Sequence, residues 1–172
     1  MDELESRILL PEGEGADCAF QLRKSPKFDR GIATIYFLEI MMDKKMLEEG
    51  TDLLIDFEKR GGLIPAIVQD VADGKILMLA YVNPEALKTT LEKGMATFWS
   101  TSRDELWTKG ETSGDFLKIV EILTDCDQDA LVYRVEPQGG GACHTKDPAT
   151  GKTRATCFYR KVDLENKLLQ ML

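Results

Sequence analysis

The chain has 172 residues, and its 22 lysine and arginine side chains against 30 aspartate and glutamate side chains give a formal net charge of -8. This length fits one domain of ordinary size, and a hydrophobic content of 43% is enough for a packed core. The negative charge repels phosphate backbones and argues against a general nucleic-acid binder. Because His144 is the only histidine, a metal site built on two or three imidazoles is excluded.

The N-terminal part of the chain carries weak structural signals. Residues 1–30 mix glycine, proline and charge, whereas residues 31–42 are predicted to form a strand. That apolar run is interrupted by Glu39 and is too short to span a bilayer. The first residues are acidic and lack the basic start of a signal peptide. We therefore predict a cytoplasmic protein with no membrane contact.

Two helices are predicted from capping residues. Thr51 can cap a helix over 52–60, and Asn83 followed by Pro84 predicts a second helix over 84–93. Glycines are expected to end both, at Gly61 and Gly94. A third, amphipathic helix is predicted at the C-terminus, over 163–172.

Strands dominate the second half of the predicted fold. Asp73-Gly74 is typical of a hairpin turn, and β-branched and aromatic residues fill the segments on both sides of it and further along. The predicted strands are 63–70, 75–82, 95–102, 116–126, 129–137 and 157–162. The predicted fold class is α+β, dominated by strands.

Three aspartates, Asp125, Asp127 and Asp129, alternate where the predicted strand 116–126 ends and the predicted strand 129–137 begins. In an extended chain their carboxylates would share one face, with Cys126 on the other. Such a group suits magnesium, and a solvated acidic turn is the open alternative. With Glu136 the aspartates match four ligand positions of a calcium-binding EF-hand, but Ala130 replaces the required glycine and strands replace the flanking helices. The EF-hand is therefore rejected.

Three cysteines, Cys126, Cys143 and Cys157, lie near the ends of predicted strands, and none forms a CxxC pair. Three thiolates with a fourth position left for water describe a catalytic zinc site, whereas three buried apolar cysteines are the alternative. His144 adjoins one of these cysteines and could shuttle protons, although a lone histidine is usually a surface or core residue.

The segment from Phe98 to Asp115 gathers aromatic, cationic and hydroxyl side chains. Aromatic faces can stack on a base, while cations and hydroxyls can hold phosphate or ribose; a strand followed by a polar loop is the alternative. The candidate substrate-binding residues are Trp99, Ser100, Ser102, Arg103, Trp107, Lys109, Ser113 and Gly114.

With these blocks in order, the chain closely resembles the phosphoribosyl-AMP cyclohydrolase family of histidine biosynthesis. The resemblance runs from about Gly61 to Lys161 through RGGLIPAIVQD, LMLAYVN, FWSTSRDELWTKGETSGD, DCDQDALVYRVE, GGGACHT and CFYRK. It implies hydrolytic opening of the N1–C6 bond in the adenine ring of 1-(5-phosphoribosyl)-AMP, with zinc-activated water as the nucleophile and His144 relaying a proton. It also implies a mixed sheet folded on itself as a pseudo-barrel with a few flanking helices.

The resemblance further implies two metals and a homodimer. Zn2+ would be held by Cys126 of one subunit and by Cys143 and Cys157 of the other. Mg2+ would be held by Asp125, Asp127 and Asp129. A single catalytic domain is then expected over residues 46–172, with residues 1–45 as an N-terminal extension.

Two features depart from the family pattern. The link KDPATGKTRAT between Cys143 and Cys157 is longer than usual, and the N-terminal extension has no counterpart. The chain also ends soon after CFYRK, so we expect the pyrophosphohydrolase domain sometimes fused to this enzyme to reside on another chain.

Two other classes of protein were weighed. A nucleobase deaminase shares the zinc–water chemistry but requires H-x-E and P-C-x-x-C, which this sequence lacks. The remaining alternative is a zinc-stabilised binding module without catalysis, whose metal would be closed by a fourth protein ligand.

Overall fold

The computed structural model describes residues 44–172, so the predicted strand at 31–42 lies outside the described residues. Within them the chain divides into two compact units. One contains residues 44–56 with Cys126–Gln128, and the other contains Phe57–Asp125 with Asp129–Leu172. None of the described helices is both long and apolar enough to cross a membrane. The boundary between extension and catalytic domain stays a prediction.

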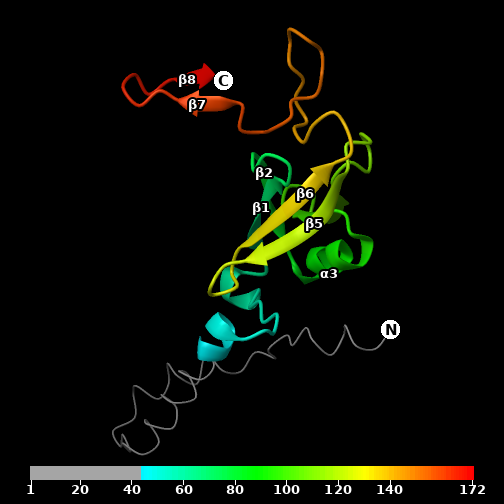
Figure 1. Ribbon diagram of the computed structural model, residues 1–172, viewed down its shortest axis with the longest axis vertical. Coiled ribbons are helices and arrows are strands. Elements are labelled where there is room, and N and C mark those ends of the chain that lie inside the picture. Colours follow the sequence, from blue (N-terminus) through cyan, green and yellow to red (C-terminus); the bar gives the residue numbers. More distant parts are fainter. Residues whose placement is uncertain (1–43) are drawn as a thin grey trace, which may run out of the picture. The chain divides into compact units, whose positions relative to one another are not determined.

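The larger unit is built on a six-stranded sheet with the strand order β4-β3-β2-β1-β6-β5. The strands are β1 (Ile64–Asp70), β2 (Ile76–Val82), β3 (Thr97–Ser100), β4 (Glu105–Thr108), β5 (Leu117–Thr124) and β6 (Leu131–Pro137). Neighbouring strands are antiparallel except β1 and β6, which run parallel, so the sheet is mixed. Figure 1 shows the long β5–β6 pair that forms one edge.

The sheet folds back on itself. The segment that precedes β3 pairs with the start of β5, the strand at the opposite edge, through the isolated bridge Met95↔Lys118. Ala96 N donates to Leu117 O at 2.9 Å, and Ile119 N donates to Gly94 O at 2.8 Å. These bonds satisfy part of the edge that β5 would otherwise expose. The prediction of a strand-dominated, mixed sheet folded on itself is confirmed.

The first hairpin and the helix that follows it match the sequence prediction closely. β1 and β2 pair around the turn that contains Asp73-Gly74. Helix α3 (Pro84–Lys93) begins at Asn83, whose side chain accepts a hydrogen bond from Ala86 N at 2.8 Å, and ends at Gly94 with a φ of 65°. Turn and cap residues determined these boundaries because each acts on its own neighbours.

The core of the sheet centres on stacked aromatic rings. Phe98 on β3 and Tyr133 on β6 are both fully buried, with ring centroids 5.7 Å apart, and Trp107 on β4 lies 5.6 Å from Phe98. Ile64, Val68 and Val135 complete the same buried layer. β3 and β4 are thereby held against β6, which fixes the hairpin that carries several candidate substrate residues.

The helix predicted over 52–60 is wrong, since only the 3-10 turn η1 (Glu58–Arg60) forms there. Thr51 at an N-cap would accept a hydrogen bond from Leu54 N. Instead Leu54 N donates to Gln128 Oε1 at 2.7 Å, and Gln128 Nε2 donates to Leu47 O and Asp52 O, each at 3.1 Å. Gln128, which is buried and distant in sequence, therefore binds the Leu54 amide that Thr51 would bind at the start of a helix.

The predicted C-terminal helix over 163–172 is also wrong. β7 (Arg160–Val162) and β8 (Leu169–Met171) instead form a two-stranded antiparallel sheet. Asp163 Oδ1 accepts hydrogen bonds from Glu165 N at 3.0 Å and Asn166 N at 3.1 Å, and Lys167 takes a left-handed φ of 56°. An aspartate that binds the following amides favours a turn over a helix. Of the strand predicted over 157–162, only 160–162 forms.

Candidate metal and substrate site

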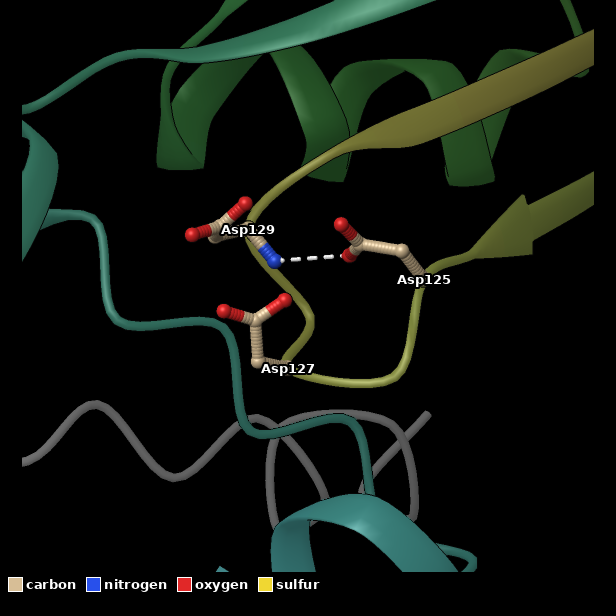
Figure 2. Close-up of side chains that lie close together, drawn as sticks. All are labelled: Asp125, Asp127 and Asp129. Carbon is tan, nitrogen blue, oxygen red and sulfur yellow. Dashed lines mark hydrogen bonds between the residues drawn. The ribbon is translucent and has the colours of Figure 1, made fainter.

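The three aspartates lie close together in the turn between β5 and β6 (Figure 2). One carboxylate oxygen from each of Asp125, Asp127 and Asp129 lies within 4.8 Å of the others. The predicted shared face of an extended strand is wrong, because residues 125–129 turn, with Gln128 at a φ of 52°. The turn, rather than strand alternation, brings the carboxylates together.

The aspartate turn has oxygens suited to a hard cation. Asp125 Oδ1 accepts hydrogen bonds from Asp129 N at 3.0 Å and Ala130 N at 3.1 Å, which fixes the turn. Asp129 forms an ion pair with Arg60, whose Nε lies 2.9 Å from Oδ2. Opposite ligands on one magnesium ion lie about 4.2 Å apart, since each oxygen is about 2.1 Å from the ion. The spread of the three carboxylates is close to that requirement.

The structure also confirms the rejection of an EF-hand. β5 precedes the aspartate turn and β6 follows it, and Glu136, which would be the twelfth loop position, lies within β6. An EF-hand loop needs helices on both sides and a glutamate that reaches back to the ion.

Cys143 and Cys157 form a pair of neighbouring thiols, each of which shifts the pKa of the other. Burial raises the pKa of Cys143, but hydrogen bonds from Thr145 and Cys157 and the charge of Arg154 outweigh burial and lower it. Thr145 Oγ1 lies 3.0 Å from Cys143 Sγ. Cys157 is exposed as a residue, but partial burial of its thiol, together with the neighbouring Cys143, raises its pKa to about 11. The pair therefore loses its first proton at Cys143.

Backbone pairing fixes the segments that carry these thiols. Cys143 N donates to Arg154 O, and Arg154 N donates to Thr145 O, both at 3.1 Å. Cys157 N donates to Leu77 O at 2.7 Å and so ties the second thiol to the sheet. The longer link between the cysteines is closed by the bridge Lys146↔Thr153. This added length does not separate Cys143 from Cys157.

The third predicted zinc ligand, Cys126, is exposed in the turn between β5 and β6. That turn precedes β6, whereas Cys143 follows it, and the seven residues of β6 span roughly 20 Å at ~3.3 Å per residue. Among residues 44–172, the aspartates are the only group of three or more Cys, His, Asp or Glu side chains with ligand atoms close together. Cys143 and Cys157 thus stand as a pair without a third such ligand in the described chain.

The predicted substrate residues on β3 and β4 fall on two faces of their hairpin. Phe98 pairs with Trp107, whereas Trp99 pairs with Leu106, so the two tryptophans point to opposite sides. Trp107 packs on the core ring of Phe98, which leaves Trp99 as the better candidate for stacking. Ser100 Oγ lies 3.4 Å from Ser102 Oγ in the turn that follows β3.

The remaining candidates differ in exposure. Arg103, Ser113, Gly114 and His144 are exposed, and Arg103 Nε pairs with Glu105 Oε1 at 2.5 Å. Lys109 is buried at 6% exposure, and its Nζ donates to Asp115 O at 3.1 Å. Burial lowers the pKa of Lys109, while Asp115, Cys157 and Cys143 act in the opposite direction. Lys109 thus lies within electrostatic reach of both thiols.

Sequence reasoning did not identify Thr145 and Asp115 as part of this region. Thr145 binds the Cys143 sulfur, and Asp115 binds Lys109 and Gly140 N, the latter at 2.7 Å. Thr145 could have been suspected, since it lies two residues from the cysteine. Asp115 lies 25 residues from Gly140, so no local pattern predicts their contact.

Clustered carboxylates and a thiol pair with one lowered pKa on a small folded-over sheet are typical of a metal-dependent enzyme. The sequence profile of the family described as "PRA-CH: Phosphoribosyl-AMP cyclohydrolase" matches residues 78–159. A phosphoribosyl-AMP cyclohydrolase of Desulfatibacillum aliphaticivorans is 52% identical over 109 residues, which is 63% of this chain and 82% of that protein. One of Brucella anthropi is 50% identical over 125 residues, 72% of this chain and 83% of that protein.

The chain therefore belongs to the phosphoribosyl-AMP cyclohydrolase family of enzymes. The resemblance drawn from the sequence is confirmed. The matched residues 78–159 include the aspartate turn and both cysteines of the thiol pair.

Proposed function

We propose that this enzyme hydrolyses the N1–C6 bond in the adenine ring of 1-(5-phosphoribosyl)-AMP, a step of histidine biosynthesis. The main support from this chain is that Cys143 and Cys157 lie as neighbouring thiols on segments fixed by backbone pairing, inside the part of the chain that matches the family. A lowered thiol pKa favours the thiolate, which is the form that binds metal. The cytoplasmic location stays a prediction.

We further propose that the thiol pair holds zinc. Two neighbouring sulfurs are soft donors of the kind that zinc prefers, and Cys126 of a second subunit would supply the third. Zinc, when bound, supplies Lewis acidity that lowers the pKa of water towards neutrality. Cys143 is prepared for this role by Thr145, which donates to its sulfur through the backbone amide at 3.4 Å.

His144 is the proposed proton relay. It directly follows Cys143 and is exposed, so its imidazole can reach both solvent and a substrate. In the proposed reaction the imidazole takes a proton from the attacking water and passes it to the departing purine N1. A positioned group of this kind contributes about 10²–10⁴-fold in rate.

The aspartate turn is the proposed magnesium site. Asp125, Asp127 and Asp129 offer hard oxygens whose spread is close to that needed by one small cation. A cation there would offset the negative charge of the chain, which otherwise repels a substrate carrying phosphates. The proposed substrate contacts remain Trp99, Ser100, Ser102, Arg103, Trp107, Lys109, Ser113 and Gly114, with Trp99 preferred for stacking because Trp107 packs on Phe98.

The zinc proposal requires a homodimer. The aspartate turn and Cys143 lie at opposite ends of β6, so a third cysteine is best supplied by another subunit. The β7–β8 segment supports such a partner, because Val162, Leu164, Leu168 and Leu169 are 58–87% exposed. A two-stranded hairpin is marginally stable alone, and large exposed apolar groups favour a protein interface. A second copy of this chain is the proposed occupant.

The direct test is whether the purified protein opens phosphoribosyl-AMP, followed by the ultraviolet change as the purine is lost. Cys143→Ser is expected to lose zinc and activity, whereas Cys18→Ser, in the proposed extension, serves as the matched control and keeps both. Asp127→Asn is expected to keep zinc but to need more magnesium, with Asp73→Asn as its control. Wild-type protein that binds zinc but leaves the substrate intact would contradict the proposal and favour a binding module.

The shared site is tested by complementation. Cys126→Ala and Cys143→Ala chains, each inactive alone, are unfolded and refolded together. Random pairing makes half of the dimers mixed, each with one intact site of two, so about a quarter of wild-type activity should return. An inactive mixture, when refolded wild type regains activity, would show that the cysteines do not act across this dimer.

Residues 1–45 are proposed to be dispensable, because every motif lies downstream. A chain that starts at Met46 is expected to fold and to open the substrate. Insoluble or inactive protein would show that the N-terminal residues belong to the catalytic domain.

A further inference from the structure

We infer that Asp115 is a positioning residue that fixes the glycine segment Gly139–Gly141 and, through it, the metal-binding geometry of Cys143. The inference rests on the proposed metal function of the thiol pair. Asp115 touches neither Cys143 nor Cys157 in any recorded hydrogen bond, so its action is through the backbone.

Asp115 is itself held in place from three sides. The buried Lys109 ammonium donates to Asp115 O at 3.1 Å, and Asp115 N donates to Ser113 Oγ at 3.2 Å. The turn before it is tight, since Gly114 N donates to Gly110 O at 2.7 Å. A Cβ on Gly110, which has a φ of 96°, would lie 2.4 Å from Phe116 N, so only glycine fits there. This support fixes the backbone from which the Asp115 carboxylate extends.

The Asp115 carboxylate lies directly against the glycine segment. Asp115 Oδ1 accepts a hydrogen bond from Gly140 N at 2.7 Å. A Cβ built on Gly139 would lie 2.4 Å from that same oxygen and 2.7 Å from Asp115 Cα. The close approach therefore depends on the aspartate at 115 and on the absence of a side chain at 139.

The residues between Gly140 and Cys143 are also constrained by packing and by backbone hydrogen bonds. A Cβ on Gly141 would lie 2.4 Å from Arg154 O, so this residue also packs against its neighbour. Ala142 N then donates to Ala155 O, and Cys143 N donates to Arg154 O, both at 3.1 Å. Residues 140, 142 and 143 are each held by a backbone hydrogen bond, and Asp115 provides the first of the three.

The affinity of a metal site depends on how closely its ligands adopt the binding geometry in the absence of the ion. Groups that orient ligands from outside the coordination sphere typically change metal affinity by about 10–100-fold when they are replaced. Losing the Asp115 bond would free Gly139–Gly141, since glycine has the widest range of backbone conformations. Cys143 would then be presented over a range of positions relative to Cys157.

The test compares Asp115→Ala with Asp115→Asn in the full-length protein. The asparagine keeps a carbonyl oxygen that can accept from Gly140 N, whereas the alanine does not. Zinc affinity is measured by competition with a chromogenic chelator, and thiolate coordination by the charge-transfer absorption of the cobalt-substituted protein. Asp115→Ala should lose about 10–100-fold in zinc affinity and show a weaker cobalt band, and Asp115→Asn should restore most of both.

Asp73→Ala is the matched control, because Asp73 also caps a backbone amide, that of Lys75 at 2.9 Å, but in the β1–β2 turn. Asp73→Ala should bind zinc and cobalt as the wild type does. Gly139→Ala provides a second route, since its Cβ would displace the Asp115 carboxylate without removing it. Gly139→Ala should show the same loss of zinc affinity, and it tests the inference even if Asp115→Ala fails to fold.

Wild-type zinc affinity and an unchanged cobalt band in a folded Asp115→Ala or Gly139→Ala protein would overturn the inference. Loss of affinity in Asp115→Ala without rescue by Asp115→Asn would also overturn it, since the hydrogen bond would not be the cause. Both readouts need no substrate. Failure of the wild type to open phosphoribosyl-AMP, with these metal results as expected, would contradict the proposed function alone.

Discussion

The six-stranded sheet and the C-terminal segment after β6 differ in how they are stabilised. The sheet buries a layer of large apolar side chains, including Phe98, Tyr133 and Ile64, each fully inaccessible. In the C-terminal segment all residues of β7 and β8 are exposed, and Leu164 reaches 87% exposure. The sheet has a fully buried apolar layer within one chain, although Leu79, Val120 and Leu123 on its strands stay exposed. The C-terminal segment is held by hydrogen bonds within its turns and by the bond from Cys157 N to Leu77 O.

This contrast separates a region whose large side chains are buried from one whose large side chains stay exposed in the described chain. Burial of large side chains contributes about 1.5–3 kcal/mol each, so the sheet has the dominant stabilising term. The β7–β8 pair lacks that term in the described chain, yet it carries Leu168, Leu169 and Met171. Apolar residues kept on an exposed hairpin are best explained by a surface that meets another molecule, as proposed for the dimer.

The largest expected effect is on the free energy of unfolding, when one phenylalanine in each region is replaced by alanine. Phe98→Ala removes a fully buried ring that packs on Trp107 and Tyr133, and it should cost about 3–5 kcal/mol in the free energy of unfolding. Phe158→Ala, in the C-terminal segment at 52% exposure, is the matched control and should change it by less than about 0.5 kcal/mol. Urea unfolding followed by tryptophan fluorescence measures both. Equal losses would show that the two regions are stabilised alike.

The same contrast explains which parts of the fold could be predicted from the sequence. The β1–β2 hairpin and α3 depend on Asp73-Gly74, Asn83 and Gly94, residues that act on their immediate neighbours. The buried strands were identifiable from β-branched and aromatic residues. These residues lie within or next to the segments whose structure they determine, so the local sequence predicts those segments.

Two features that the sequence patterns missed depend on residues distant in the chain. Gln128 takes the amide of Leu54, 74 residues away, and so replaces a helix start that looked well formed. The Asp115–Gly140 contact also joins distant residues. Positions set by side chains from elsewhere in the fold leave no periodic pattern in the sequence.

The phenol of Tyr133 is fully buried in the sheet. Burial raises the pKa of Tyr133 to about 12, against a smaller opposite effect of its hydrogen bond with Thr90. A raised folded-state pKa means that the neutral phenol stabilises the fold below pH 10 and that this contribution is lost as the pH rises towards 12. The full loss should be about 2–3 kcal/mol above pH 12, at 1.36 kcal/mol per pKa unit, and about half of it should be present at pH 11.

Tyr133→Phe should therefore flatten the alkaline fall in stability. Urea unfolding of wild type and variant is compared at neutral pH and at steps up to about pH 11, where the two curves should converge or cross. Identical alkaline slopes in the two proteins would show that Tyr133 is not the buried group responsible.

The smallest expected effect is confined to the C-terminal hairpin and has the opposite pH dependence. Hydrogen bonds from Asn166, first from its backbone amide and then from its side chain, lower the pKa of Asp163 below the ordinary value of 3.8, and Glu165 N adds to this. A lowered folded-state pKa stabilises the turn above the ordinary value, and that contribution is lost as the pH falls through the lower one. Acidification should therefore open the β7–β8 turn while the sheet stays folded.

The amide shifts and hydrogen exchange of Glu165 and Asn166, followed by NMR to about pH 2.5, measure this opening. Asp163→Asn, which keeps an acceptor but does not titrate, should show no such transition. If the sheet amides shift together with those of Glu165 and Asn166, the two regions unfold as one unit and the contrast between them fails.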